Sequence, residues 1–171
     1  MFIKKVNYLY KFLIIFFLIL PINISRAEFF KDISNIITIN ENRLSYGVSV
    51  TDINSDGNNE FIVTGFGYPN LALSYIDGKL KNIIQKDIFL DQDRKTIGVA
   101  ACDLDKDGFE EIYFLNTDTY SGTKKYSDRL IDKKKNNFFD LFELKKNREN
   151  LNLTAGRSVV CVDRKGDGEY G

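Results

Sequence analysis

Histidine is absent from this chain, and the absence removes two common kinds of chemistry. Catalysis by a histidine base and zinc binding through histidine are both excluded. Net charge is absent too, because 24 basic residues balance 24 acidic ones. Residues 1–27 hold four of the basic residues and no acid, so the remainder has 20 basic and 24 acidic residues. This mildly acidic body argues against nucleic-acid binding, which needs a basic face.

A hydrophobic run long enough to span a membrane is also missing. The run from Phe12 to Leu20 follows three lysines and ends at Pro21, and it is much shorter than the roughly 20 residues of a spanning helix. Small residues follow at Ser25 and Ala27, as in a secretory signal peptide. We expect residues 1–27 to be such a signal, cleaved after Ala27, with an uncleaved anchor as the alternative. The mature protein would then be extracellular or periplasmic, with no membrane span.

What the chain does contain is a nine-residue acidic loop, present twice in full and once in altered form. The copies are DINSDGNNE (Asp52–Glu60), DLDKDGFEE (Asp103–Glu111) and DRKGDGEYG (Asp163–Gly171). Each follows a β-rich run, namely GVSVT, GVAAC and SVVCV. The pattern predicts a repeat fold in which each complete loop can hold a hard cation.

Calcium takes six to eight oxygen ligands, and these loops offer oxygens at positions 1, 3, 5, 7 and 9. Position 7 contributes a backbone carbonyl, and glycine at position 6 allows a sharp turn. The predicted ligands are Asp52, Asn54, Asp56, Asn58 and Glu60 in the first loop, and Asp103, Asp105, Asp107, Phe109 and Glu111 in the second. Their side chains carry charges of −3 and −4, so we expect the second loop to bind calcium more tightly.

An EF-hand shares part of this pattern but needs a glutamate at position 12 and a helix on each side. Position 12 is Val63 or Phe114, and short β-branched and aromatic runs follow both loops. The loops are therefore predicted to join strands. The simpler alternative is a solvated turn. Both full copies have a glutamate at position 9, and this repetition favours a metal site, because clustered carboxylates repel one another without a cation.

The third copy departs from the pattern at position 3, where Lys165 stands, and at position 9, which is Gly171. We expect this loop to bind no calcium. The Lys165 ammonium could take the place of the ion and neutralise Asp163 and Asp167.

Cysteine is scarce, with only Cys102 and Cys161. An exported protein could pair them. However, Cys102 lies one residue before its loop and Cys161 lies two before, which points them to opposite faces of equivalent strands. Buried free thiols are the expectation, and a catalytic cysteine is disfavoured because no histidine is present to activate it.

The loops begin 51 and then 60 residues apart, a period typical of propeller blades. Each repeat contains four strand-like runs, including an Asp77-Gly78 hairpin signal in the first. The expected second repeat ends in a DRLID strand, a solvated lysine-rich turn at 133–135 and an outer strand at Phe138–Leu144. The predicted division is a signal (1–27), an N-terminal segment (28–46), blade 1 (47–97), blade 2 (98–156) and the start of blade 3 (157–171).

The N-terminal segment contains FFKDI at Phe29–Ile33, which echoes FFDLF at Phe138–Phe142. In a closed propeller, such a segment supplies the outermost strand of the last blade. Two blades cannot close a ring, which takes about 4 to 8. We therefore expect this all-β chain to be the N-terminal part of a longer protein.

These loops resemble FG-GAP/VCBS repeats, as in integrin α-chain propellers. GVSVTDINSDGNNEFIV, IGVAACDLDKDGFEEIYFLNT and AGRSVVCVDRKGDGEYG are similar to the start of the cartilage acidic protein (ASPIC/UnbV) family. The resemblance covers about residues 45–171 and implies a secreted, calcium-binding, seven-bladed β-propeller.

The expected function is a non-enzymatic interaction module with structural calcium and a protein or glycan partner. The polar loop Thr117–Ser127, with Tyr120 and Tyr126, is a candidate partner surface, and a plain surface loop is the alternative. Two other readings stay open. One is an exported propeller enzyme whose active site lies outside this sequence, and the other is a truncated product without function.

Overall fold

The structure is a computed structural model that describes residues 30–84, 87–135 and 137–171. Contacts divide the chain into a unit that ends at Ile33 and a unit of Ser34–Gly171. Most of the first unit, including the predicted signal peptide and its cleavage site, lies outside the described residues. Every helix and strand in the described ranges belongs to the second unit. None of these helices has the length and apolar character that a membrane-spanning segment requires.

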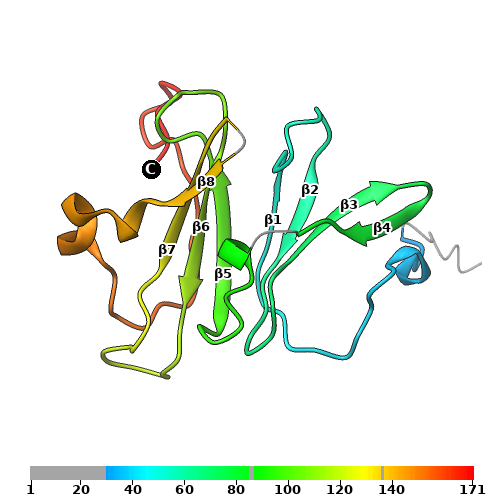
Figure 1. Ribbon diagram of the computed structural model, residues 1–171, viewed down its shortest axis with the longest axis horizontal. Coiled ribbons are helices and arrows are strands. Elements are labelled where there is room, and N and C mark those ends of the chain that lie inside the picture. Colours follow the sequence, from blue (N-terminus) through cyan, green and yellow to red (C-terminus); the bar gives the residue numbers. More distant parts are fainter. Residues whose placement is uncertain (1–29, 85–86, 136) are drawn as a thin grey trace, which may run out of the picture. The chain divides into compact units, whose positions relative to one another are not determined.

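The first repeat forms one antiparallel sheet whose strands lie in chain order (Figure 1). Its strands are β1 (Val48–Thr51), β2 (Glu60–Val63), β3 (Leu71–Ile76) and β4 (Lys79–Asn82). Asp77 and Gly78 join β3 to β4, and both have positive φ, at 53° and 76°. Two positive φ values give the twist that a two-residue hairpin needs, so the predicted Asp-Gly hairpin is confirmed.

The second repeat forms another antiparallel sheet in chain order. Its strands are β5 (Thr96–Cys102), β6 (Glu111–Asn116), β7 (Arg129–Lys134) and β8 (Asn137–Asp140). The predicted outer strand at Phe138–Leu144 is wrong in its second half, because β8 ends at Asp140. The Asp140 carboxylate accepts a hydrogen bond from the N–H of Phe142 at 3.0 Å and caps a 3-10 helix. This helix is η3 (Leu141–Glu143), and η4 (Lys145–Asn150) follows it.

Two further 3-10 helices precede the sheets, η1 (Ser34–Ile36) and η2 (Asp87–Phe89). After η1, Ile37 forms an isolated parallel bridge with Leu80 of β4. Residues 30–33, the described part of the predicted ring-closing segment, belong to no strand. Ring closure needs a blade outside these residues and stays a prediction.

The described residues thus form two four-stranded antiparallel sheets with short helices and no closed barrel. The prediction of an all-β chain with two propeller-like blades of four strands is confirmed.

One hydrophobic core joins the two sheets. Its buried members are Ile53, Ile62, Ala72, Phe89, Val99, Ile112, Phe114 and Ile131. The Phe89 ring of η2 packs edge-on against Phe138 and Phe114, with centroids 4.7 and 6.5 Å apart. Each fully buried large side chain contributes about 1.5–3 kcal/mol, so this core is a main reason why the two sheets stay together.

The two sheets approach each other closely near the beginnings of β1 and β5. A Cβ atom placed on Gly47 would lie 2.9 Å from the Cα atom of Gly98. A real Cβ does not come so close to backbone, so the approach of the two strands requires glycine at position 47.

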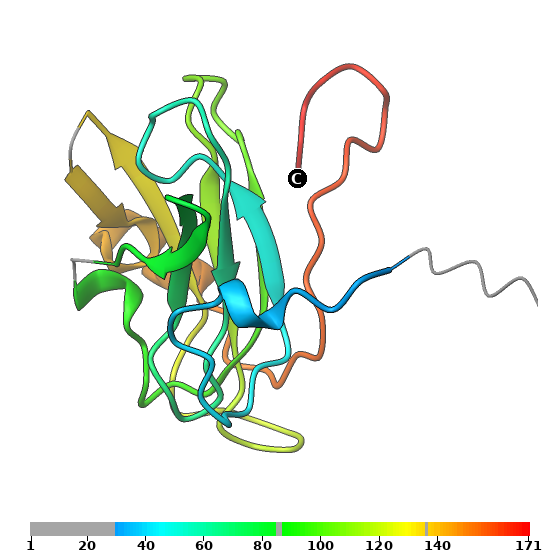
Figure 2. The ribbon, with the colours of Figure 1, turned by 90° about the vertical axis from the view of Figure 1, so that its right-hand side faces the viewer.

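The predicted strand at Ser158–Val162 is not formed, and the segment after η4 runs without strand structure (Figure 2). A strand needs a partner for its backbone groups, and this segment pairs with none of the described strands.

Cys102 and Cys161 form a disulfide, with Cα atoms 6.3 Å apart. The prediction of buried free thiols is therefore wrong. The parity argument required both cysteines to lie on equivalent strands. Cys102 ends β5, but Cys161 lies in a segment with no strand alternation, so its side chain is free to face Cys102.

Candidate metal centre

Both complete acidic loops connect two neighbouring antiparallel strands. Thr51 pairs with Glu60 across the first loop, and Cys102 pairs with Glu111 across the second. Position 9 of each loop is therefore the first residue of the next strand. This arrangement confirms the predicted strand-to-strand loops and excludes the flanking helices of an EF-hand.

The opening aspartate organises each complete loop through its two carboxylate oxygens. Asp103 accepts the N–H of Asp107 at 3.2 Å and that of Gly108 at 3.0 Å. Asp52 accepts the corresponding pair of N–H groups in the first loop, at 3.0 and 2.8 Å. Because the same two donors are used in both copies, the two loops share one backbone turn.

The backbone of this turn is left-handed at two positions. Gly57 and Gly108, at position 6, have φ of 86° and 90°, as the glycine pattern predicted. Ser55 and Lys106, at position 4, have φ of 62° and 63°, which the sequence did not indicate. A non-glycine residue in this region costs about 1–2 kcal/mol, and the hydrogen bonds to the opening aspartate offset that cost.

The closing glutamates are buried, with Glu60 0% and Glu111 3% exposed. Glu60 accepts the N–H of Ile53 at 3.2 Å, and Glu111 accepts that of Leu104 at 2.6 Å. Burial raises the pKa of both carboxyl groups, because desolvation disfavours the charged form. A cation beside these carboxylates would offset that cost.

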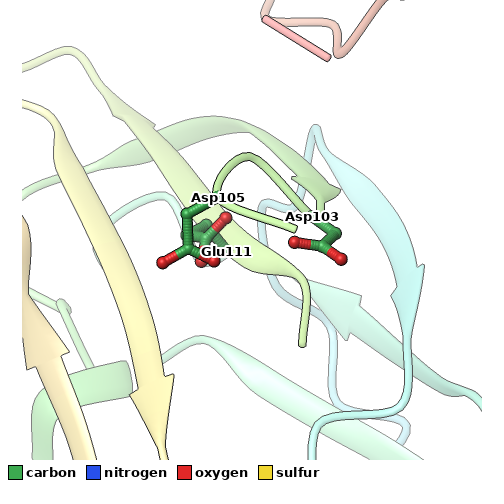
Figure 3. A group of neighbouring side chains, drawn as sticks. All are labelled: Asp103, Asp105 and Glu111. Carbon is green, nitrogen blue, oxygen red and sulfur yellow. The ribbon is translucent and has the colours of Figure 1, made fainter. Parts of the chain in front are cut away.

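The second loop gathers three acidic side chains (Figure 3). Asp103, Asp105 and Glu111 each place a carboxylate oxygen within 4.8 Å of the others, and among the described residues no other such group of three occurs. Oxygen donors at this spacing suit a hard cation such as calcium, which takes ligands at about 2.3–2.6 Å. Three of the predicted ligands of the second loop are thus brought together.

The first loop differs at position 3, where Asn54 replaces aspartate. The Asn54 carbonyl oxygen accepts the N–H of Asp56 at 2.9 Å. Its amino group therefore faces the acids, 2.9 Å from Asp56 Oδ2 and 3.5 Å from Glu60 Oε1. For Asn54 to ligate a cation, its amide must turn and give up the bond to Asp56, which is worth about 1 kcal/mol.

The remaining predicted ligands lie in equivalent places in the two loops. Asn58 donates its N–H to Asp56 at 2.8 Å, and Phe109 donates its N–H to Asp107 at 2.9 Å. The bond from the backbone of Asn58 lowers the pKa of Asp56. Carbonyl ligation by Asn58 and Phe109 stays a prediction.

The third loop keeps the turn. Val162 and Gly171 exchange two backbone hydrogen bonds of 3.2 Å, which close it as the other loops are closed. Asp163 accepts the N–H of Gly168 at 2.7 Å, and this bond lowers its pKa. Lys165 is exposed, and within the described residues it forms no ion pair with Asp163 or Asp167. The expectation that its ammonium neutralises these two carboxylates is therefore wrong. That this loop binds no calcium stays a prediction.

Lys133, which was expected in a solvated turn, is only 7% exposed. Its ammonium donates to the carbonyl oxygen of Ile53 at 3.1 Å and to the hydroxyl of Ser55. The ammonium also lies 5.2 Å from the ring centre of Phe109. The lysine run was misleading because β7 continues into it, so the successive residues Lys133 and Lys134 face opposite sides of the strand.

Two residues that sequence reasoning missed lie on the third strand of each sheet. Ser74 is the fourth residue of β3, and Asp132 is the fourth residue of β7. Both are buried. Aligning the two third strands could have found them, but only the register shows that they face the closing glutamates.

The loop Thr117–Ser127 is held by hydrogen bonds of its own. Asp118 accepts the N–H of Lys125 at 2.8 Å, and the buried Lys124 pairs with Asp128. Tyr120 is 87% exposed. The loop therefore has a fixed course with an exposed aromatic side chain, and a partner role stays a prediction.

Four-stranded sheets joined by acidic hairpin loops are typical of a class of β-repeat protein, and comparison of the chain with known protein families agrees. Residues 52–114 match the FG-GAP-like repeat family, a match that runs from the opening of the first loop to Phe114 of β6. This part of the chain is thus similar to an FG-GAP-like repeat.

The chain is also similar to cartilage acidic protein 1. It is 45% identical to the protein of that name from Xenopus tropicalis and 44% identical to that from Homo sapiens, in each case over 142 residues that cover 77% of this chain and 22% of the relative. The Mus musculus protein is 43% identical over the same coverage. The chain thus spans about a fifth of the length of these curated relatives. The predicted resemblance is confirmed. That the chain is not an enzyme stays a prediction.

Proposed function

We propose that this chain is part of an extracellular β-propeller that binds calcium in its complete acidic loops. The observation that carries the proposal is the convergence of Asp103, Asp105 and Glu111 on one side of the second loop. The same backbone turn in the first loop supports a second, weaker site there.

The role of the ion is structural. A bound cation would join the end of β5 to the beginning of β6, because the loop's first ligand follows one strand and its last ligand begins the next. It would also offset the burial of Glu111. Since binding favours the folded state alone, calcium raises stability by mass action.

The propeller form is supported by a face of the first sheet that carries exposed apolar residues. Val50 and Phe61 lie opposite each other on β1 and β2 and are 47% and 43% exposed. Such a face suits packing against another blade. Export is supported by the signal-like first 27 residues, and its test is whether the mature protein begins at Glu28.

We further propose that the assembled propeller is an interaction module with a protein or glycan partner. Its support is the class of repeat and the exposed Tyr120 on a loop of fixed course. Exchange of Tyr120 for alanine would leave folding unchanged and weaken partner capture.

Thermal unfolding of the purified protein with calcium or with a chelator tests the central proposal. At a calcium concentration 100 times Kd, the stabilisation is about 2.7 kcal/mol, or roughly 5–10 °C in Tm for a chain of this size. Asp105→Ala should remove most of this increment. Glu110→Ala is the matched control, because Glu110 is an exposed acid beside Glu111 and outside the ligand set. A folded protein whose Tm is the same with and without calcium would contradict the proposal.

A further inference from the structure

Asp132 is a buried acid that the loop motif does not include. It lies on β7 and is 1% exposed. Its Oδ1 atom accepts no hydrogen bond within the described part of the chain. Its Oδ2 atom lies 3.5 Å from the ammonium of Lys134, whose side chain is 61% exposed, so solvent weakens this pair. A buried carboxylate oxygen without a donor is costly and calls for a ligand that is not part of the chain.

The strand register places Asp132 against the metal loop. Ile112 of β6 lies opposite Ile131 of β7, so the next pair along the same register is Glu111 and Asp132. Side chains directly opposite each other in an antiparallel sheet share a face, with Cβ atoms about 4.5–5.5 Å apart. β7, in yellow, runs past the Asp105 and Glu111 side of the group (Figure 3). The negative charges of Asp105 and Asp132 both add to the effect of burial in raising the pKa of Glu111.

In the first repeat, a different kind of residue lies opposite the closing glutamate. Phe61 of β2 lies opposite Leu73 of β3, so Glu60 faces Ser74. Ser74 is buried and hydrogen-bonds to Glu60, and this bond opposes part of the rise in the pKa of Glu60 that burial causes. A hydroxyl donor thus satisfies the closing glutamate in the first sheet, whereas a second acid faces it in the second sheet. Like charges directly opposite each other destabilise a sheet unless a cation lies between or beside them.

We propose that Asp132 is a further acidic side chain of the second metal site, supplied by β7 from outside the loop. This inference rests on the proposed calcium site of the second loop. Asp132 lies outside the group whose oxygens are all within 4.8 Å of one another, which suits a carboxylate that holds a metal-bound water rather than the ion. The second site then has five acids around it, where the first has three and a hydroxyl.

Isothermal titration of the purified full chain with calcium chloride tests the role of Asp132. Asp132→Asn keeps the shape of the side chain and removes its charge. Calcium affinity at the tighter site should fall about 10-fold, within the range for outer residues of metal sites. Ser74→Ala, at the equivalent position of the first sheet, should leave that affinity unchanged.

Thermal unfolding separates a metal role from a purely structural one. Without calcium, Asp132→Asn should be as stable as the wild type or more stable, because it removes the repulsion from Glu111. With saturating calcium, its Tm increment should be smaller than that of the wild type. Equal losses of Tm in both conditions would show a structural role and overturn the proposal.

A gain-of-function variant provides an independent test. Ser74→Asp places an acid opposite Glu60 and should tighten the weaker calcium site about 10-fold.

Two outcomes separate this inference from the proposed function. If Asp132→Asn binds calcium with wild-type affinity while Glu111→Gln loses binding, the role of Asp132 is overturned and the calcium site stands. Absence of calcium binding in the wild type would instead overturn the proposed function, and this inference with it.

Discussion

The first and second repeats share one loop and differ in what surrounds it. Both loops join paired strands, turn at the same positions and bury their closing glutamate. In the first sheet, that glutamate meets the Ser74 hydroxyl and the amino group of Asn54. In the second, Glu111 meets Asp105 and faces Asp132. The comparison shows that the loop motif determines the turn, whereas residues on other strands determine how much negative charge a bound cation would neutralise.

The repeats also differ in how they are tied to the rest of the chain. The second loop follows Cys102 and is linked covalently to the segment before the third loop. The first loop is held instead by Lys133, which reaches it from the other sheet. Four experiments can break or sharpen this comparison.

Loss of the disulfide should have the largest effect. The bond closes a loop of 59 residues, and the chain-entropy model gives about 4 kcal/mol for removing it. The double variant Cys102→Ala, Cys161→Ala should therefore unfold at a much lower denaturant concentration. A reducing agent should lower the wild-type midpoint by a similar amount and leave the variant unchanged. If reduction has no effect on the wild type, the second repeat is not tied in this way.

Replacing the buried Lys133 should have the second-largest effect. Lys133→Met keeps the apolar length of the side chain but leaves the Ile53 carbonyl and the Ser55 hydroxyl without their donor. The expected cost is about 2 kcal/mol, measured by chemical unfolding. Lys135→Met is the control, because Lys135 is exposed and its substitution should change stability by less than about 0.5 kcal/mol. Equal effects of the two substitutions would contradict the burial of Lys133.

Alanine at the two equivalent glycines should give unequal results. Gly47→Ala places a Cβ atom 2.9 Å from the backbone of Gly98, and overpacking of this kind costs about 1–3 kcal/mol. For Gly98→Ala, the nearest atoms to the new Cβ belong to the side chains of Val159 and Leu115, at 3.4 and 3.5 Å, which is close to ordinary contact. Its cost should stay below about 1 kcal/mol. A shift of the urea midpoint that is as large for Gly98→Ala would argue against the close approach of β1 and β5.

The smallest effect concerns the first loop alone. Asn54→Asp replaces the amino group that faces the acids with a carboxylate oxygen and makes position 3 match the second loop. Calcium affinity of the first loop should rise about 10-fold, equivalent to about 1.4 kcal/mol, in a calorimetric titration. Asn59→Asp adds the same charge at exposed position 8 and should change the affinity much less. If both substitutions act alike, net charge rather than ligand geometry separates the two loops.

Much of the fold could be predicted because its signals are local. Alternation of apolar residues, the Asp77-Gly78 turn and the glycines at position 6 each act within a few neighbouring residues. The strand-to-strand loops were predicted correctly for the same reason. The end of β8 was missed because one side chain, Asp140, caps a helix where the apolar pattern continues.

The errors share a different origin. Cys161 was assigned to a strand face although its segment finds no partner strand, and Lys133 was assigned to solvent although β7 carries it between the sheets. In both cases the composition of a short segment indicated its local character. It did not indicate which other parts of the chain pack against that segment.

The sequence by itself determined the repeat, the hairpin loops and the residue types able to ligate a hard cation, because these depend on spacing along the chain. Only the tertiary structure decided that Cys102 meets Cys161, that Lys133 holds the first loop and that Asp132 faces Glu111. Each of these contacts joins residues from different elements, and strand register and sheet packing, rather than sequence distance, determine which side chains come together.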